Sequence, residues 1–422
     1  MVGGGAREHA LVRALSLDPA VTGLHAAPGN PGIGALARLH AVDQLDGAAV
    51  ARLAVSLGVD LVVVGPEAPL VAGVADAVHA VGIPVFGPSA QAARLEGSKA
   101  FAKEVMAAAG VPTATARVAT TVEEVAAALD EFGAPHVVKE DGLAAGKGVV
   151  VTSDRAAALE HAASCLAKPG GRVVVEEFLD GPEVSLFVLS DGSAVVPLQP
   201  AQDFKRVDDD DAGPNTGGMG AYSPLPWAPS GLVDEVVATV AAPTVAEMSR
   251  RGTPFAGVLY CGLALTSRGV RVVEFNARFG DPETQVVLAR LATPLAGVLL
   301  AAATGRLAEL PPLVWHDEAA VTVVVAAHGY PGEVRSGDAI TGIDAAERAG
   351  AHVLHAGTAV RDGVLVAAGG RVLSVVGTGV DLAAAREAAY AGVERIALAG
   401  SHHRTDIARR AAEDQAAGAG PA

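Results

Sequence analysis

Cysteine is scarce in this chain of 422 residues, with only Cys165 and Cys261 present. The two lie far apart, no CxxC spacing occurs and no histidine cluster lies near either of them. Neither a disulfide scaffold nor a zinc site is therefore indicated. The chain also lacks any apolar run of about 18 residues, and its N-terminus shows no signal-peptide pattern. We expect a cytoplasmic protein that does not contact membranes.

Lysine and arginine are also few relative to the acidic residues. The 31 lysines and arginines are outnumbered by 47 aspartates and glutamates, which gives a formal net charge of −16. This balance argues against general nucleic-acid binding, which needs basic faces that release counterions from phosphates. It is compatible with a small anionic ligand if cations are concentrated locally. Half of the residues are apolar, and the length predicts about two to four compact domains.

The first hundred residues predict a parallel α/β domain. Strands are expected at 61–64 and 83–86 and helices at 7–17 and 48–57, an alternation typical of a parallel sheet. Turns rich in glycine and proline follow the apolar runs, at the strand ends where open α/β sheets bind ligands. Only two residues precede the first glycine turn, whereas a strand has about five. We therefore expect the natural start to lie a few codons upstream.

The rest of the chain predicts a mixed α+β region and a smaller β-rich one. Helices are expected at 98–109 and 155–165, and strands at 137–139, 148–152, 172–176, 184–189, 257–265 and 270–275. The valine-rich segment 314–376 predicts further strands. The expected divisions are an N-terminal α/β domain at 1–98, a central region at 99–312 with a mobile lid at about 115–183, a β-rich domain at 313–412 and a frayed tail at 413–422.

A glycine turn opens the first predicted helix and carries Gly5, Arg7, Glu8 and His9. Backbone amides and the helix dipole at such a position favour a phosphate. Glu8 stands where the dinucleotide fingerprint has its third glycine, which argues against a nicotinamide-dependent oxidoreductase. A purely structural turn is the alternative interpretation.

A second glycine-rich loop lies between two predicted strands, with Lys139 at the end of the first strand and Gly146, Lys147 and Gly148 before the second. Two cations and bare amides suit a polyphosphate. The loop is no Walker loop, because it leads into a strand, so a plain surface hairpin is the alternative. We expect residues 141–149 to be mobile without nucleotide.

An acidic turn between two predicted strands carries Glu176, Glu177, Phe178, Leu179 and Glu183. Its backbone groups can pair with an adenine edge, and a carboxylate can bind ribose hydroxyls. Taken alone, a sequence of this kind is more often an ordinary acidic surface turn.

Two further segments point to metal and substrate binding. Strand alternation places Glu274, Asn276 and Arg278 on one face, where two oxygen ligands and a cation suit Mg²⁺ and an attached phosphate. A solvated strand face is the alternative. The segment 202–220 shows no regular periodicity, and its glycine amides can approach a small carboxylate closely. A flexible linker is the competing interpretation.

Five motifs occur in an order that resembles the phosphoribosylamine-glycine ligase family of the ATP-grasp superfamily, and the similarity runs from Gly3 to about Ile407. They are Gly-Ala-Arg-Glu-His-Ala at 5–10, Val-Gly-Pro-Glu-Ala-Pro-Leu at 64–70, Leu-Glu-Gly-Ser-Lys at 95–99, Pro-Asn-Thr-Gly-Gly-Met-Gly-Ala-Tyr-Ser-Pro at 214–224 and Glu-Phe-Asn-Ala-Arg-Phe-Gly-Asp-Pro-Glu at 274–283.

The resemblance implies central ATP-grasp domains and a monomer that joins glycine to 5-phosphoribosylamine through glycyl phosphate, with ATP and Mg²⁺ or Mn²⁺. Lys99 and Lys139 would contact the ATP phosphates, with Gly146 to Gly148 in the covering loop. Glu176 to Leu179 would line the adenine, and Glu183 would take the ribose. Glu274 and Asn276 would bind the metal, and Arg278 would join Lys139 at the transferred phosphoryl group. The expected substrate-binding residues are Gly5, Arg7, Glu8, His9, Glu67, Asp203, Lys205, Asn215, Thr216, Gly217, Gly218 and Asp281.

Three positions depart from the family pattern, namely Glu140, Phe204 and His328. None of them replaces an expected phosphate or metal contact. Another ATP-grasp carboxylate-amine ligase is the nearest alternative, and a non-enzymatic nucleotide sensor is a more distant one. The segment 214–220 and the Arg7-Glu8-His9 sequence favour the glycine enzyme.

Overall fold

Short parallel strands organise the N-terminal region of the computed structural model, which describes residues 1–143 and 148–418. Strand β2 (His25–Pro28) pairs in parallel with β1 (Val2–Gly3) and β3 (Arg38–Leu39), and β4 (Val62–Val63) pairs in parallel with β5 (Val85–Phe86). A bridge between Val2 and Val64 links the two sets. The parallel pattern is thus confirmed, although the strands are shorter than expected. Helices α1 (Ala6–Ser16), α2 (Gly47–Leu57), α3 (Glu67–Val71) and α4 (Val74–His79) complete the region.

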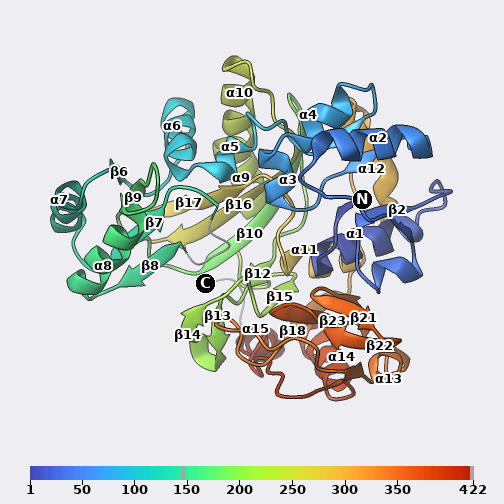
Figure 1. The fold of residues 1–422 in the computed structure, drawn as a ribbon. Helices are drawn as coiled ribbons and strands as arrows, with labels where there is room; N and C mark the ends of the chain where they lie inside the picture. The colour runs from blue at the N-terminus through green and yellow to red at the C-terminus, as the bar shows by residue number, and fades with distance from the viewer. Residues whose placement is uncertain (144–147, 419–422) are drawn as a thin grey trace.

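A four-stranded sheet forms the lobe that carries α7 and α8 in Figure 1. Its order is β6 (Ala116–Ala119), β9 (Val173–Glu176), β7 (His136–Glu140) and β8 (Val149–Thr152), and α7 (Val122–Phe132) and α8 (Arg155–Leu166) pack on it. The predicted hairpin is confirmed, because Lys139 pairs with Val149. Strand β6 and helix α7 were missed, although Thr121 and Glu124 form the capping box that signals such a helix start.

The central sheet is antiparallel and buried on both faces. Its order is β11 (Val195–Pro197), β10 (Glu183–Asp191), β16 (Ala256–Thr266) and β17 (Gly269–Asn276). Residues alternate between two cores: Leu186 and Cys261 lie in the cluster that includes residues of α6 (Lys99–Ala109) and α10 (Ala242–Arg250), whereas Phe187 and Tyr260 lie in the cluster of α11 (Glu283–Arg290) and α12 (Leu295–Ala303). The short helices α5 (Arg94–Gly97) and α9 (Leu232–Val236) flank this sheet (Figure 1).

The C-terminal sheet draws strands from two distant parts of the chain. Its order is β12 (Gln202–Asp203), β15 (Gly220–Ser223), β18 (Ala319–Ala326), β23 (Arg371–Gly379) and β20 (His352–His355), with α14 (Leu382–Val393) packed on β23 and β18. The expectation that 202–220 lacks regular structure is wrong, because β13 (Arg206–Asp208) also pairs with β14 (Ala212–Asn215). This segment pairs with strands far away in sequence, which no local periodicity can reveal.

The remaining C-terminal elements are short. They are β19 (Ile340–Thr341), α13 (Ile343–Arg348), β21 (Thr358–Arg361), β22 (Val364–Ala367), β24 (Ala397–Leu398) and α15 (Arg409–Ala416). The C-terminal region is therefore rich in β-strands, as expected, and it also contains helices. The expectation of a frayed tail from residue 413 onward is wrong for residues 413–416, which continue α15. Residues 419–422 lie outside the described residues. Within the described ranges, no helix is both long and apolar enough to span a bilayer.

Candidate active site

Two lysines hold one buried carboxylate where the four-stranded sheet of β6, β9, β7 and β8 meets the central sheet. Lys139 Nζ lies 2.8 Å from Glu176 Oε2 and donates to the Val273 carbonyl at 2.9 Å. Lys103 Nζ, from α6, lies 2.9 Å from Glu176 Oε1. Burial raises the pKa of Glu176, but Lys139 and Lys103 outweigh it and leave this pKa below its usual value. Lys103 was not among the predicted residues, and no motif distinguishes it.

The other predicted nucleotide contacts extend from this pair. Lys99 begins α6 and donates to the Gly142 carbonyl at 3.0 Å, and its burial lowers its pKa. Glu177 turns away from Lys139, because it accepts from the Thr115 amide at 2.9 Å and pairs with Arg268 at 3.0 Å. Phe178 is exposed and Leu179 is half-buried. Gly146 and Lys147 lie outside the described residues, whereas Gly148 accepts from the Glu140 amide at 2.7 Å.

Glu183, predicted to take the ribose, forms an ion pair with Lys205. The Lys205 ammonium holds the pKa of Glu183 below its usual value. Lys205 Nζ also lies 3.8 Å from Asp203, whose side chain is only 9% exposed. Burial raises the pKa of Asp203 to about 7. Glu183, a predicted nucleotide-binding residue, thus lies beside Lys205 and Asp203, which are predicted substrate-binding residues.

The end of β17 brings Asn276, one of the two predicted metal ligands, and Arg278, the predicted phosphoryl residue, to Glu96. Arg278 Nη2 lies 2.9 Å from Glu96 Oε1. The Asn276 side-chain amide, oriented with its nitrogen toward this carboxylate, donates to the same oxygen at 3.1 Å. Arg278 Nε lies 3.2 Å from Glu67, so this predicted substrate residue joins the cluster. The predicted three-residue strand face is wrong in one respect, because β17 ends at Asn276 and leaves Arg278 in the following loop.

In this Glu96 cluster, the two carboxylates stabilise the charge of Arg278, whereas burial disfavours the charge of Glu96. Burial alone would lower the pKa of Arg278, but Glu96 and Glu67 raise it above its usual value. Burial raises the pKa of Glu96 despite the nearby guanidinium. Glu96 belongs to the Leu-Glu-Gly-Ser-Lys motif at 95–99, but the sequence alone indicates no role for it.

The N-terminal glycine turn is held by its own side chains. Glu8 Oε2 accepts from the Gly5 amide at 2.6 Å and Glu8 Oε1 lies 2.5 Å from Arg7 Nε, while Arg7 Nη1 donates to the Phe279 carbonyl at 3.0 Å. Arg7 therefore reaches the loop that carries Arg278. His9 points elsewhere, because its Nδ1 accepts from the His355 amide at 2.8 Å.

Arg371 ties the predicted glycine-binding loop to Asp281. Its Nη1 donates to the Gly217 carbonyl at 2.5 Å and to the Asp281 carbonyl at 2.7 Å, and it lies 3.4 Å from Asp281 Oδ1. The Tyr330 hydroxyl accepts from the Gly217 amide at 2.9 Å, and Thr216 Oγ1 accepts from the Gly218 amide at 3.0 Å. Asn215 pairs with Arg206 in the β13–β14 ladder.

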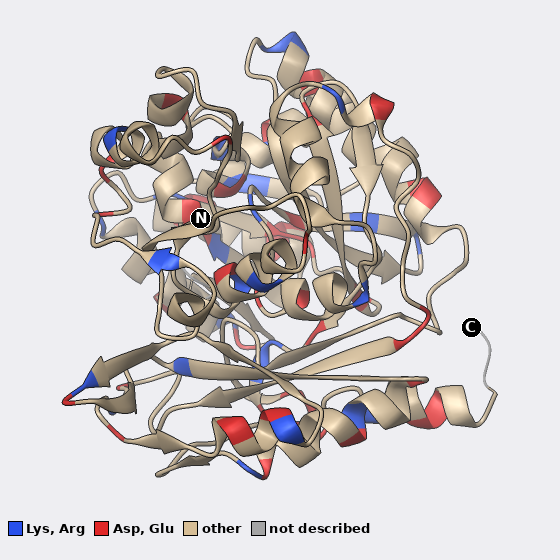
Figure 2. Ribbon diagram, turned by 90° about the vertical axis from the view of Figure 1, so that its right-hand side faces the viewer, with Lys and Arg blue, Asp and Glu red and all other residues tan. Residues whose placement is uncertain are grey.

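The three positions that depart from the family pattern make ordinary contacts. Glu140 pairs with Lys168 at 2.5 Å, the Phe204 ring lies 4.8 Å below the Arg404 guanidinium carbon, and the His328 carbonyl accepts from Arg335. Basic and acidic segments lie interspersed in the view of Figure 2. Four cations of the candidate site are paired with carboxylates, namely Lys103, Lys139, Lys205 and Arg278.

The fold and this site define a class of protein. The model for the ATP-grasp (A) domain of phosphoribosylglycinamide synthetase matches residues 97–284. The biotin carboxylase domain of 2-oxoglutarate carboxylase from Hydrogenobacter thermophilus, solved with MgADP, ADP and bicarbonate, has a similar fold, with 17% identity and a TM-score of 0.68 over 95% of this chain and 90% of that one. The chain is an ATP-grasp protein.

The rest of the chain identifies the family. The N and C domain models of phosphoribosylglycinamide synthetase match residues 1–96 and 320–410. The phosphoribosylamine-glycine ligase of Streptomyces coelicolor is 70% identical over 415 residues, which cover 98% of this chain and 99% of that protein. The crystal structure of the Thermotoga maritima ligase shares 32% identity, with a TM-score of 0.84 over 96% of this chain and 98% of that one. This chain belongs to the phosphoribosylamine-glycine ligase family.

Proposed function

We propose that this chain joins glycine to 5-phosphoribosylamine in an ATP-dependent reaction that yields glycinamide ribonucleotide, ADP and phosphate. It is a ligase of a family whose reaction belongs to purine biosynthesis, and its relatives match along nearly the whole chain. One observation carries the assignment to this site. Lys139 donates to the carbonyl of Val273, the residue before Glu274, at 2.9 Å. Glu274 lies opposite Gly262, which lies opposite Ser185, two residues from the Glu183 that pairs with Lys205, so the predicted phosphate, metal and substrate residues share one place.

The chemistry needs positioned charge more than a protein nucleophile. Glycine's carboxylate is a poor electrophile, so the γ-phosphoryl group of ATP first transfers to it, giving ADP and glycyl phosphate. The amine of phosphoribosylamine then attacks the acyl carbon and inorganic phosphate leaves. Lys99 and Lys139 neutralise the phosphates, and Arg278 stabilises the transferred group. Residues Glu176 to Leu179 line the adenine, and Glu183 takes the ribose.

The donor set at the end of β17 fits Mg²⁺ or Mn²⁺. Glu274 and Asn276 offer a carboxylate and an amide oxygen, which are hard ligands, and both side chains are half-buried. Mg²⁺ typically takes one or two carboxylates and completes its shell with water and substrate phosphates, so two protein ligands suffice. The metal, when bound, would neutralise charge on the transferring phosphoryl group.

The substrates have separate places in this proposal. Asp281 and the loop that carries Gly217 and Gly218, held by Arg371, lie on the side that receives glycine, whereas Arg7 and Glu67 face the phosphoribosylamine. The ion pair of Lys205 with Glu183 links the two halves of the site. Glu8 and His9 contribute by fixing the turn that carries Arg7.

One assay tests this proposal. We expect ADP and phosphate to form only when ATP, Mg²⁺, glycine and freshly made phosphoribosylamine are all present. Omission of each component in turn is the control. Equal turnover with another amino acid in place of glycine would instead identify a different ATP-grasp carboxylate-amine ligase.

A further inference from the structure

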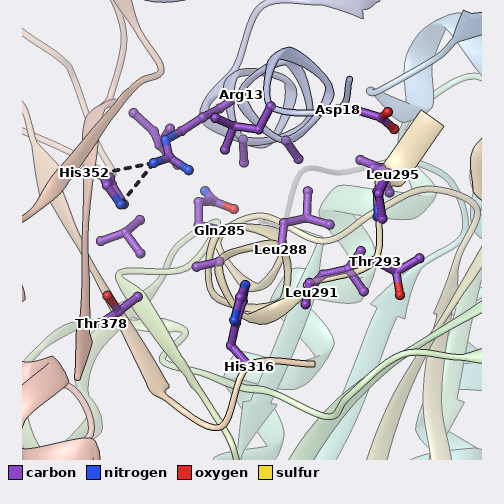
Figure 3. Close-up of a pocket in the computed structure, with 18 of the residues that line it drawn as sticks. Arg13, Asp18, Gln285, Leu288, Leu291, Thr293, Leu295, His316, His352 and Thr378 are labelled. Atoms are coloured by element: carbon purple, nitrogen blue, oxygen red, sulfur yellow. Dashed lines mark hydrogen bonds between the residues drawn. The ribbon is translucent and has the colours of Figure 1, made fainter. Parts of the chain in front are cut away.

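Gln285 is a buried polar residue with no part in the ligation described above. It lies on α11, in the wall of the cavity drawn in Figure 3, and only 2% of its surface is exposed. Its Nε2 donates to Asp281 Oδ1 at 2.8 Å and to Ser374 Oγ at 3.4 Å. Asp281 precedes α11, so the contact ties the inside of this helix to the loop of the candidate site.

The packing of α11 gives no reason for a glutamine at this position. Gln285 Oε1 is buried and accepts no hydrogen bond from the residues that the structure describes. Exchanging the two amide atoms would set an oxygen against the Asp281 carboxylate, so the amide keeps this orientation. A buried amide oxygen without a partner destabilises a fold. An apolar side chain of the same length would suit the fold better, which leaves the contact with Asp281 as the use of the glutamine.

The two oxygens of the Asp281 carboxylate have different surroundings. Oδ1 accepts from Gln285 and lies 3.4 Å from Arg371 Nη1. Within the described ranges, no group donates to Oδ2, which lies 3.8 Å from the place that a Cβ on Gly5 would take. Gly5 belongs to the turn predicted to bind substrate. Gln285 therefore fixes which oxygen of Asp281 is turned toward the substrates.

Cations from several elements keep Asp281 ionised. Burial alone would raise its pKa, but Arg371 from β23, Arg7 from α1, the hydrogen bond from Gln285 and Arg278 from the loop after β17 leave this pKa below its usual value. An ionised carboxylate with one oxygen held and the other free suits an ammonium group, because charge-assisted hydrogen bonds are strong.

We propose that Gln285 is a positioning residue, which turns the Asp281 carboxylate so that Oδ2 accepts from the ammonium of glycine while Oδ1 stays bound to Gln285. This inference rests on the ligation proposed above and adds to it the residue that orients the partner of the substrate ammonium. Gln285 itself does not touch the substrate.

Gln285→Met tests the proposal, because it removes the amide donor and the unpaired oxygen and keeps the length of the side chain. We expect KM for glycine to rise by about tenfold, with kcat and KM for ATP nearly unchanged. The matched control is Thr322→Val, which also removes a buried oxygen without a described partner, on β18, and should leave both KM values unchanged. A wild-type KM for glycine in Gln285→Met, or an equal rise in both KM values, would overturn the proposal.

A double-mutant cycle shows whether Gln285 acts through Asp281. In the Asp281→Asn background, Gln285→Met should raise KM for glycine by less than about twofold, because the group that it positions is already altered. The same large rise in both backgrounds would mean that Gln285 acts by another route, against the proposal.

Gln285→Glu is the second variant, for the case that Gln285→Met does not fold. The protonated form of the new carboxyl can still donate to Asp281, whereas its ionised form repels it. Relative to the wild type, KM for glycine should rise by about tenfold between about pH 6 and about pH 9, and a pH profile like that of the wild type would contradict the proposal. Wild-type turnover in the same assay separates the two conclusions: if the wild type does not consume glycine, the proposed function fails, and if it does, the variants decide on Gln285.

Discussion

At the scale of single residues, the candidate site is built from buried charges that satisfy one another. Lys103 and Lys139 share Glu176, and Arg278 spans Glu96 and Glu67. Removing one partner of a buried pair costs about 3–5 kcal/mol, because the other charge is left uncompensated. Activity and stability must therefore be measured together in every variant of these residues.

Lys139→Ala is expected to lower kcat by about 10²–10³, since it removes charge stabilisation from the transferring phosphoryl group. The matched control is Lys168→Ala, which removes a half-exposed lysine paired with Glu140 in the same lobe. Steady-state kinetics with a melting temperature for each variant would check this. A similar loss in both variants would show that the effect is not specific to the site.

Glu274→Gln keeps the size of the side chain but removes the charge expected to bind the metal. We expect the Mg²⁺ concentration for half-maximal rate to rise by about tenfold or more. Glu235→Gln, on the exposed face of α9, serves as the control. An unchanged Mg²⁺ dependence in Glu274→Gln would remove this residue from the metal site.

His9 makes stability depend on pH. Burial, with the nearby His355 and Arg13, lowers its pKa to about 3, below the unfolded value of 6.5. The folded state thus binds fewer protons, and stability present above pH 6.5 is lost as the pH falls toward 3. Between pH 7 and pH 5 the loss is about 2 kcal/mol. Denaturant unfolding of the wild type and His9→Asn should show a smaller pH dependence in the variant, and equal dependence would contradict the assignment.

At the scale of elements, the segment between β12 and β15, which we propose binds substrate, is held in place by backbone hydrogen bonds and by Arg371. The Thr216 amide donates to the Lys205 carbonyl at 2.7 Å and the Met219 amide to the Phe204 carbonyl at 2.7 Å, which closes the segment on itself. Arg371, from β23, then fixes Gly217 against Asp281. A glycine-rich loop is thereby held in one conformation by the C-terminal sheet.

Arg371→Gln should loosen this loop. We expect KM for glycine to rise by about tenfold with KM for ATP nearly unchanged, because a charge-assisted contact on the substrate side is lost. Arg361→Gln, an exposed position of β21, is the control. A parallel rise in both KM values would indicate a general change in structure.

At the scale of the whole molecule, one sheet joins the central and C-terminal parts of the chain. Strand β15 pairs with β18, with Gly220 opposite Val323 and Ser223 opposite Ala320. Because β18 and β23 continue the same sheet, neither part can complete its hydrogen bonding alone. We expect these two parts to unfold together.

Gly220→Ala tests this connection. A Cβ at this position would lie 2.7 Å from both the Thr322 carbonyl oxygen and Ile407 Cδ1, whereas one at Gly231 meets nothing within 4 Å. Gly220→Ala is expected to destabilise by about 1–3 kcal/mol, and Gly231→Ala by less than about 1 kcal/mol. Hydrogen exchange should show the loss of protection in β15, β18 and β23 together. A loss confined to β15 would mean that the sheet is not one cooperative unit.

The sequence by itself determined the elements whose signals are local. The periodicity of α1, α2, α6 and α8, the β7–β8 hairpin around Lys139 and the order of the five motifs all depend on neighbouring residues. The roles of Lys103, Glu96 and Arg371 were decided only by tertiary structure, since each meets its partner across a long stretch of chain. The same holds for the strands within 202–223, whose sheet partner β18 lies about a hundred residues away. Local patterns report which face of an element is apolar, whereas partners brought together by packing leave no periodic trace in the sequence.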